Sequence, residues 1–282
     1  MKKKCVYTKS SASKTVAVVV PIFMRKELTP DEQISLRHVL YHLRKYDKYI
    51  VAPKSLDVEF PGFEIKRFDN IFFGSAIANT RLMLSSEFYE AFCDYHYILI
   101  CQLDALVFSD QLLEWCELGF DYIGAPWLNV PGSPWVDVPR VGNGGFSLRK
   151  VQSFLQVIYS DQYTVEPKLY WENFCRGKPK LVQYLNLHKK YLKYLVRFNG
   201  ARWEIAKWHS RKDGRANEDF FWSDEAIRYY FQFKIAPVDI GLRFSFEIDP
   251  RHCFELNNRQ LPFGCHAWPR YDREFWEPYL LK

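Results

Sequence analysis

The feature that most constrains the fold is an unbroken run of β-branched residues near the amino terminus. Residues 15–23 read TVAVVVPIF, with no polar residue after Thr15. Strands that are buried on both faces, as in a parallel sheet covered by helices, have runs of this kind. Pro21 cannot donate to a sheet ladder, so its place near the end of the run predicts a strand whose carboxyl end opens into a loop.

A helix is predicted directly after this strand. Thr29 is a typical N-cap residue, Pro30 suits the first helical position, and Glu32 completes a capping box. Four apolar residues between positions 36 and 43 follow at i, i+3, i+4 and i+7. This spacing gives the helix one apolar face, which we expect to pack on the sheet.

The strand-then-helix order repeats along the first half of the chain. Alternating strands and helices predict a mostly parallel sheet with helices on both faces, whose ligands bind at the carboxyl ends of the strands. The predicted fold is therefore α/β, Rossmann-like, with one domain over residues 1–282. The further elements that we expect are strands at 49–52, 63–68 and 97–103, an aromatic-rich helix at 77–92, and a short helix capped by Ser109 and stopped by Gly119.

Composition narrows the class of protein. Hydrophobic residues make up 48% of the 282 residues, which supplies material for a large core. The seven cysteines form no C-x-x-C pair, so neither a disulfide framework nor a zinc site is expected. No apolar stretch reaches the roughly 18 to 20 residues that span a bilayer, and the basic opening MKKK leads into polar residues and not into a signal-peptide core. We expect a cytoplasmic protein, either free or peripheral at the inner face of the membrane.

Residues 162–216 differ from the rest, being rich in Lys, Arg, Tyr and Trp. We interpret them as a basic helical insertion. The whole chain has a net charge of +6, and this basic region fits an anionic acceptor or an anionic membrane surface. The alternatives are a solvated helical hairpin without a partner and, ranked lower, a surface that binds single-stranded nucleic acid.

Three segments carry candidate chemistry. Asp104 ends the buried strand at 97–103, where a carboxylate suits a divalent cation or else caps the following turn. The GNGG segment at 142–145 implies close backbone approach to a ligand or another segment, or only a tight turn. Glu218 and Asp219 lie beside FFW, so partial burial would make one of them a general base, while a helix start favours the same acidic pair.

Histidine and tryptophan supply the remaining candidates. His266, in a segment punctuated by Pro and Gly, either ligates a metal, contacts a phosphate, or is a structural residue. Trp127 and Trp268 either stack on a sugar ring or belong to the core.

Taken in order, these segments resemble a family of bacterial GT-A-like glycosyltransferases that has long been catalogued as a domain of unknown function. The resemblance spans most of the chain except the basic insertion. The matching stretches are VVVPI (18–22), MLSSEFYEAF (83–92), YILICQLDALVF (97–108), FDYIGAPW (120–127), GNGGFSLR (142–149), NED (217–219) and PFGCHAW (262–268).

The resemblance implies a reaction and a role for each matching residue. The reaction would transfer a sugar, with inversion, from a nucleoside-diphosphate sugar to a glycan or lipid-linked acceptor hydroxyl in surface polysaccharide synthesis. Asp104 matches the last carboxylate of a D-x-D metal element, whose first position is Gln102 here, so dependence on Mn²⁺ or Mg²⁺ is in question. Glu218 and Asp219 would be the acidic pair that contains the base, and His266 would lie beside the metal. The nucleotide would contact Pro21, Gln102, Asp104, Gly144 and Gly145. The sugars would contact Trp127, Asn143 and Trp268.

Two rival functions remain at this stage. One is a catalytically silent sugar- or nucleotide-binding module on the same fold, because a fold does not define a function. The other is nucleic-acid binding by the basic region, which would give the acidic motifs no role.

Overall fold

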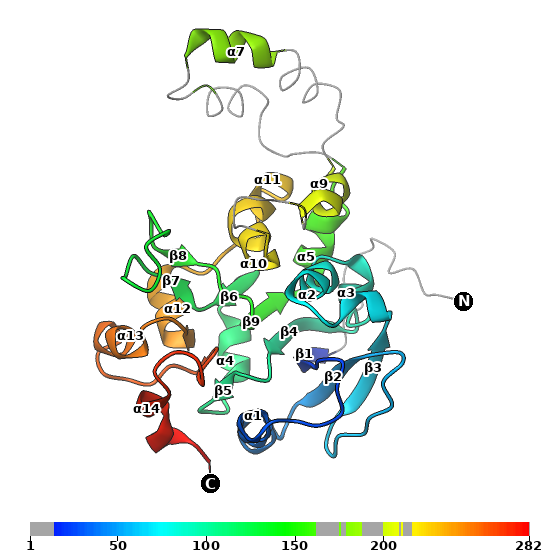
Figure 1. Ribbon diagram of the computed structural model, residues 1–282, viewed down its shortest axis with the longest axis vertical. Helices are drawn as coiled ribbons and strands as arrows, with labels where there is room; N and C mark the ends of the chain where they lie inside the picture. Colours follow the sequence, from blue (N-terminus) through cyan, green and yellow to red (C-terminus); the bar gives the residue numbers. More distant parts are fainter. Residues whose placement is uncertain are drawn as a thin grey trace.

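The computed structural model describes residues 14–161, 175, 179–187, 200–208, 210 and 216–281. Its central sheet has six strands in the order β3-β2-β1-β4-β9-β6 (Figure 1). These strands are β1 (Lys14–Pro21), β2 (Asp47–Pro53), β3 (Glu64–Phe68), β4 (Tyr95–Cys101), β6 (Tyr122–Gly124) and β9 (Phe146–Lys150).

The sheet is mostly parallel. β1 pairs in parallel with both β2 and β4, and β2 pairs in parallel with β3. β9 runs antiparallel between β4 and β6. The predicted α/β domain with a mostly parallel central sheet is therefore confirmed.

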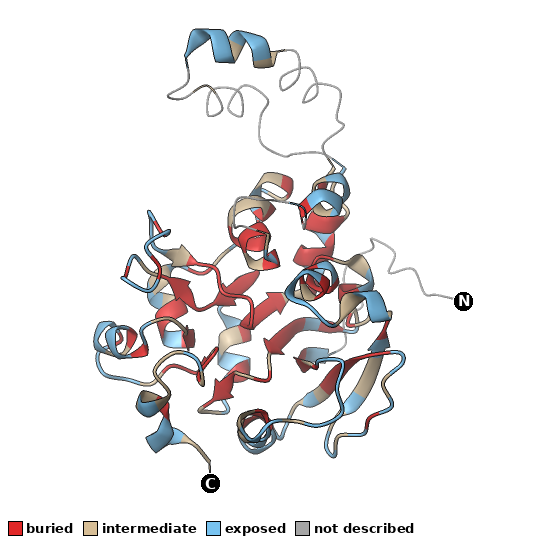
Figure 2. Ribbon diagram, viewed as in Figure 1, coloured by how far each residue is buried: buried red, intermediate tan, exposed pale blue. Residues whose placement is uncertain are grey.

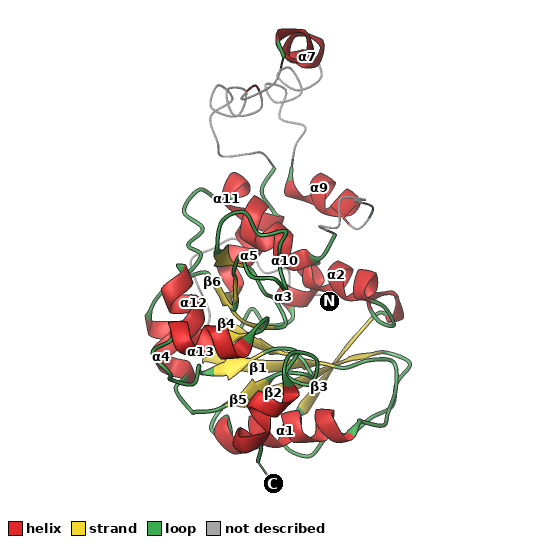
Figure 3. Cartoon of the chain, turned by 60° about the vertical axis from the view of Figure 1, so that its left-hand side comes forward, coloured by secondary structure: helices red, strands yellow, loops and turns green. Residues whose placement is uncertain are grey.

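Helices cover both faces of this sheet. In Figure 3, α1 lies on one side and α2, α3 and α5 lie on the other. The first half of the chain contains α1 (Pro30–His42), the 3-10 turn η1 (Asn70–Phe72), α2 (Ala76–Met83), α3 (Ser86–Glu90), α4 (Leu112–Glu117) and α5 (Val151–Ile158). The second half contains α7 (Lys180–Asn186), α9 (Ala201–Trp208), α10 (Glu218–Phe220), the π-helical turn η3 (Phe221–Glu225), α11 (Ala226–Tyr229), α12 (Val238–Phe244), α13 (Pro250–Leu256), α14 (Arg273–Trp276) and the 3-10 turn η4 (Glu277–Tyr279).

Two small sheets flank the central one. The first has the order β10-β11-β5, from β10 (Ser245–Phe246), β11 (Gly264–Cys265) and β5 (Leu106–Val107). The second pairs β7 (Pro126–Trp127) with β8 (Arg140–Val141). Each of these strands has only two residues, too few to show an alternation of apolar and polar residues.

The apolar run that begins the chain forms the centre of the core. Val16 to Val20 are at most 5% exposed, and the central strands are largely buried in Figure 2. Full burial of one such valine side chain contributes about 1.5–3 kcal/mol. Among the described residues, free thiols are found at Cys101, Cys116, Cys175, Cys253 and Cys265.

Local signals predicted most element boundaries, with two exceptions. The capping box at Thr29 forms as predicted, and Gly119, with φ of +72°, follows the end of α4. The single helix expected at 77–92 is instead α2 followed by α3, because the Ser85 hydroxyl accepts from the Phe88 N–H and starts a second helix. Ser109 does not cap α4; its hydroxyl bonds to the Gln111 side chain.

The basic insertion predicted at 162–216 lies largely outside the described residues, which contain α7 and α9 from it. Across the described ranges, we find no helix that combines the length and the apolar character needed to cross a membrane.

Candidate active site

Topology singles out one edge of the central sheet. From β1 the chain moves outward to β2 and then β3, whereas β4 lies on the opposite side of β1. Ligands of open α/β sheets bind at such a switch point, outside the carboxyl ends of the two strands. Here those ends are Pro21 in β1 and Cys101 in β4, which leads into Gln102 and Asp104.

A pocket of about 230 Å³ opens at this switch point. Its walls come from the segment after β1, the turn before α2, and the segment after β4. Gly74, with φ of +93°, makes the turn, and Ser75 caps α2 through the Ala78 N–H. The lining residues are Pro21, Ile22, Phe23, Phe72, Phe73, Gly74, Ser75, Ala76, Asn79, Gln102, Leu103 and Asp104.

The small sheet β10-β11-β5 gathers three ionisable side chains beside this pocket. β10 and β11 are parallel, so Glu247 and His266, which follow them, emerge at the same edge. β5 is antiparallel to β11, so Asp104, which precedes β5, reaches that edge as well. Strand register thus explains how residues 162 positions apart in the sequence meet.

His266 lies between the two carboxylates. Its Nε2 is 3.3 Å from Asp104 Oδ1 and 3.2 Å from Gln102 Oε1, and its Nδ1 is 3.0 Å from Glu247 Oε1. Burial alone would lower the pKa of His266, but Asp104 and Glu247 raise it to about 10. Burial alone would raise the pKa of Asp104, but His266 and then Arg270 hold it below its ordinary value. In this arrangement the imidazole carries its second proton.

The donors at this edge fit a divalent cation only in part. Asp104, the Gln102 amide oxygen and His266 are donors that Mn²⁺ accepts. Within the described part of the chain, no group of three or more His, Cys, Asp or Glu side chains forms a complete cation site. Such a partial set matches the way that Mg²⁺ and Mn²⁺ complete their coordination with water and substrate phosphates. A cation that takes His266 as a ligand must first displace a proton from it.

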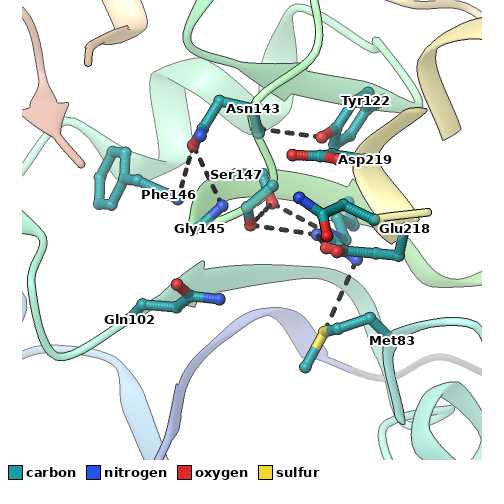
Figure 4. A network of polar contacts seen from close by, with 12 residues as sticks. Met83, Gln102, Tyr122, Asn143, Gly145, Phe146, Ser147, Glu218 and Asp219 are labelled. Carbon is teal, nitrogen blue, oxygen red and sulfur yellow. Dashed lines mark hydrogen bonds and ion pairs between the residues drawn. The ribbon is translucent and has the colours of Figure 1, made fainter. Parts of the chain in front are cut away.

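Figure 4 shows the glycine segment at Gly145 between Gln102, which contacts His266, and the acidic pair. A Cβ on Gly145 would lie 2.1 Å from His266 Nε2, and one on Gly144 would lie 2.5 Å from Glu218 Oε1. Neither position has room for a side chain, so the close approach predicted from GNGG is to other segments of the protein. Tyr122 holds the segment in place by donating to the carbonyls of Gly142 and Asn143.

Arg149 ties the acidic pair to the glycine segment. Its side chain is fully buried, and its Nη2 donates to Glu218 Oε1 at 2.9 Å and to the Gly144 carbonyl at 3.1 Å. Its Nη1 donates to the Tyr89 hydroxyl at 2.9 Å, and its Nε donates to Ser147 Oγ at 2.9 Å. The simple helix-start explanation of Glu218 is therefore insufficient, because this carboxylate has a specific buried partner.

Asp219 has a different environment from Glu218. Its carboxylate accepts a hydrogen bond from the Phe220 N–H at 2.9 Å, and it forms no ion pair with another described residue. Burial and the nearby carboxylates of Glu218 and Glu247 raise its pKa well above the ordinary value. The pair also begins a helical stretch that contains the π-helical turn η3, a feature frequent at functional sites. A carboxyl group with a raised pKa is suited to accept a proton in general-base catalysis.

The three residues predicted at the sugars are each at most 4% exposed. Trp268 is fully buried and its indole donates to Ser35 Oγ, so it belongs to the core. Trp127 is 4% exposed and packs on Phe220 at 4.6 Å. The Asn143 side chain accepts from the Gly145 N–H and lies 3.1 Å from His266 Nδ1, so it shapes the glycine turn.

Two site residues escaped the sequence-based reading. Glu247 interrupts the apolar run 244–248, and Arg149 stands in the strand FSLRK, whose first four residues are all buried. A charged side chain inside an apolar strand was the signal in both cases. Its partner could not be read from the sequence.

A larger depression, of about 690 Å³, lies at the opposite end of the sheet, around the amino-terminal ends of β1 and β2. Two ion pairs lie in its lining, Lys14 with Asp47 and Lys45 with Asp110. Neither glycine turn nor acidic pair lies among its lining residues, so we place the candidate active site at the carboxyl ends.

Fold and site together define an α/β protein with a pocket at a topological switch point. The cluster of His266 with two carboxylates and the acidic pair Glu218–Asp219 belong to the same site. A family model described as "Protein of unknown function (DUF5672)" matches residues 62–266, and the chain belongs to this family. No curated protein matches the chain.

Solved structures of glycosyltransferases are similar to the chain at low identity. The glycosyltransferase GlyE of Streptococcus pneumoniae TIGR4 is 12% identical, with a TM-score of 0.44, over 94% of this chain and 60% of that protein. A glycosyltransferase involved in glycosylation of the major capsid of PBCV-1 is 10% identical, with a TM-score of 0.41, over 94% of this chain and 98% of the other. The chain thus spans less than two thirds of the pneumococcal protein. Likeness at this level fixes neither the reaction nor the substrates.

Proposed function

We propose that this protein is a glycosyltransferase that moves a sugar from a nucleoside-diphosphate sugar to an acceptor hydroxyl. One observation carries the proposal: the glycine turn at Gly144 and Gly145 stands between the Asp104–His266 cluster and the Glu218–Asp219 pair. A glycosyl-transfer site holds the diphosphate of the donor on one side and accepts the proton of the acceptor hydroxyl on the other, and this arrangement supplies groups for both.

The donor occupies the pocket at the switch point. Phe23, Phe72 and Phe73 supply aromatic surface for a nucleoside, and Asp104 marks the end where the diphosphate lies. A divalent cation bound through Asp104, His266 and Gln102 would neutralise charge on the leaving diphosphate. With one carboxylate in this donor set, such a cation would need oxygen ligands from the donor diphosphate to complete its coordination.

Asp219 acts as the general base, and Glu218 is held aside by Arg149. The acceptor oxygen attacks the anomeric carbon while its proton passes to Asp219. The bond from that carbon to the diphosphate breaks, and the nucleoside diphosphate leaves with the electron pair. A base placed for direct attack favours a single displacement with inversion, and general-base catalysis of this kind contributes roughly 10²- to 10⁴-fold.

The test is a panel of nucleoside-diphosphate sugars, with and without Mn²⁺, monitored by thermal stabilisation and by release of nucleoside diphosphate. We expect one donor to stabilise the protein and to be consumed. Asp219→Asn should reduce turnover about 10²- to 10⁴-fold and keep the donor-induced shift, and Asp104→Asn should reduce that shift. Glu117→Gln, at an exposed position on α4, is the matched control.

Two outcomes would count against the proposal. If no nucleotide sugar stabilises the protein or is consumed, the assignment of the pocket is wrong. If a donor binds but wild type and Asp219→Asn turn over equally slowly, the protein is a binding module and not an enzyme.

A further inference from the structure

A second pocket, of about 350 Å³, opens beside the acidic pair. Phe220, which directly follows Asp219, forms part of its wall. No residue lines both this pocket and the one at the switch point.

An exposed tryptophan stands over this pocket. Trp135, on the loop between β7 and β8, is 41% exposed. Its ring is nonetheless held on two sides, by Trp127 at 5.2 Å and by Phe220 at 5.4 Å, both edge-on. The loop is braced by a bond from Ser133 Oγ to the Leu128 carbonyl. A large ring that is fixed by its neighbours yet open to solvent offers apolar area to a ligand at little cost in conformational entropy.

Polar groups converge on the same opening. Arg140 donates to Asp224 through two bonds, Nε to Oδ1 at 2.8 Å and Nη2 to Oδ2 at 3.1 Å. Both side chains remain partly exposed, at 29% and 27%. A bidentate pair of this kind presents donors and acceptors in fixed directions, which suits neighbouring hydroxyl groups.

The charge of the lining selects the class of ligand. The lining contains three carboxylates, of Asp137, Asp224 and Glu225, and two guanidinium groups, of Arg140 and Arg228. Its net charge is therefore −1. A phosphate or carboxylate on the ligand would meet net repulsion here. A neutral sugar has an apolar C–H face for Trp135 and hydroxyls for the polar groups.

We propose that this pocket binds a neutral sugar unit of the acceptor, with Trp135 as its stacking platform. The inference rests on the proposed function, since it supplies the acceptor side of the same reaction. It also assigns sugar stacking to Trp135, which solvent reaches, and not to Trp127 or Trp268, which are buried. The position of Phe220 next to Asp219 places the bound unit beside the proposed base.

The experiment measures sugar binding first, without the donor. The probes are methyl glucosides, galactosides and mannosides and their 1,4-linked disaccharides, detected by saturation-transfer NMR and titrated by tryptophan fluorescence. We expect at least one neutral probe to bind, with affinity at least 10-fold lower in Trp135→Ala and within threefold in Trp135→Phe. The uronic-acid counterpart of the best probe should bind at least fivefold more weakly.

Trp203→Ala is the matched control, because Trp203 on α9 is 42% exposed and lies outside this pocket. With a donor identified, Trp135→Ala should raise the acceptor KM at least 10-fold and leave donor hydrolysis and the donor KM within twofold. If Trp135→Ala folds and binds the probes as wild type does, if the uronide binds as tightly, or if no neutral probe binds, this proposal is overturned. Sugar binding is measured without the donor, so the two proposals can fail separately. Failure of sugar binding overturns the acceptor pocket, and failure of the donor assay overturns the proposed function.

Discussion

Replacing Arg149 by methionine removes the guanidinium group that joins the acidic pair to the glycine turn. The Glu218 side chain is 7% exposed and that of Arg149 is 0% exposed, so neither charge has water as an alternative partner. Methionine keeps most of the length and apolar volume of the stem, which limits the effect to the guanidinium. We expect the variant to fold with reduced stability.

The expected loss of stability follows from the groups that Arg149→Met leaves without a partner. Breaking a buried pair from one side costs about 3–5 kcal/mol, because the other charge is left uncompensated. Arg149→Met also removes the donors to the Tyr89 and Ser147 hydroxyls, so the upper part of this range is expected. Adding Glu218→Gln removes the uncompensated charge. The double variant should therefore be more stable than the sum of the two single changes predicts, by about 2–3 kcal/mol.

Urea unfolding of wild type, Arg149→Met, Glu218→Gln and the double variant measures this coupling. The control cycle is Lys45→Met with Asp110→Asn, a pair that is mostly exposed, at 61% and 54%, and for which we expect no measurable coupling. If the free-energy changes of the Arg149 cycle add to within about 0.5 kcal/mol, the buried pair does not hold the acidic residues as described.

Three further predictions concern single positions. Gly145→Ala should abolish turnover and lower the melting temperature, because its Cβ would lie 2.1 Å from His266 Nε2; wild-type activity in this variant would contradict the close approach. The rate of transfer should fall as the pH drops through the raised pKa of Asp219, and Glu218→Gln should move this acid limb to lower pH, since a neighbouring negative charge is lost; a limb that does not move excludes Asp219 as the base. His38 bridges a backbone carbonyl and a backbone N–H, and burial lowers its pKa, so in acid the unfolded chain takes up a proton that the folded chain resists. Urea midpoints should therefore fall with pH below about 6.5, and less so in His38→Asn; equal pH dependence of the two proteins would refute this.

Signals that act within a few residues made the secondary structure largely predictable. The capping box at Thr29 depends on contacts three residues apart, and the strand at 15–23 depends on composition alone. The break between α2 and α3 was missed because Ser85 and Ser86 stand in a stretch whose apolar pattern continues. Only the hydrogen bond from the Phe88 N–H to Ser85 Oγ reveals a new start.

Composition does not predict which tryptophan side chains are exposed to solvent. Trp127, Trp135 and Trp268 are chemically identical, yet solvent reaches 4%, 41% and 0% of them. Exposure of a ring is set by what the rest of the chain packs on it. For the same reason, the loop at 128–139 gave no advance sign of a binding surface.

The sequence by itself determined that a central strand ends near Pro21, that another delivers Asp104 to a sheet edge, and that Gly144, Gly145, Asp219 and His266 carry unusual local patterns. These properties follow from hydrophobic pattern and backbone preference, which need no distant partner. The tertiary structure alone decided that Glu247 joins His266, that Arg149 holds Glu218, and that Gln102 lies beside His266. Such pairings are set by the register of short strands and by buried charge, and both exist only once the chain has folded.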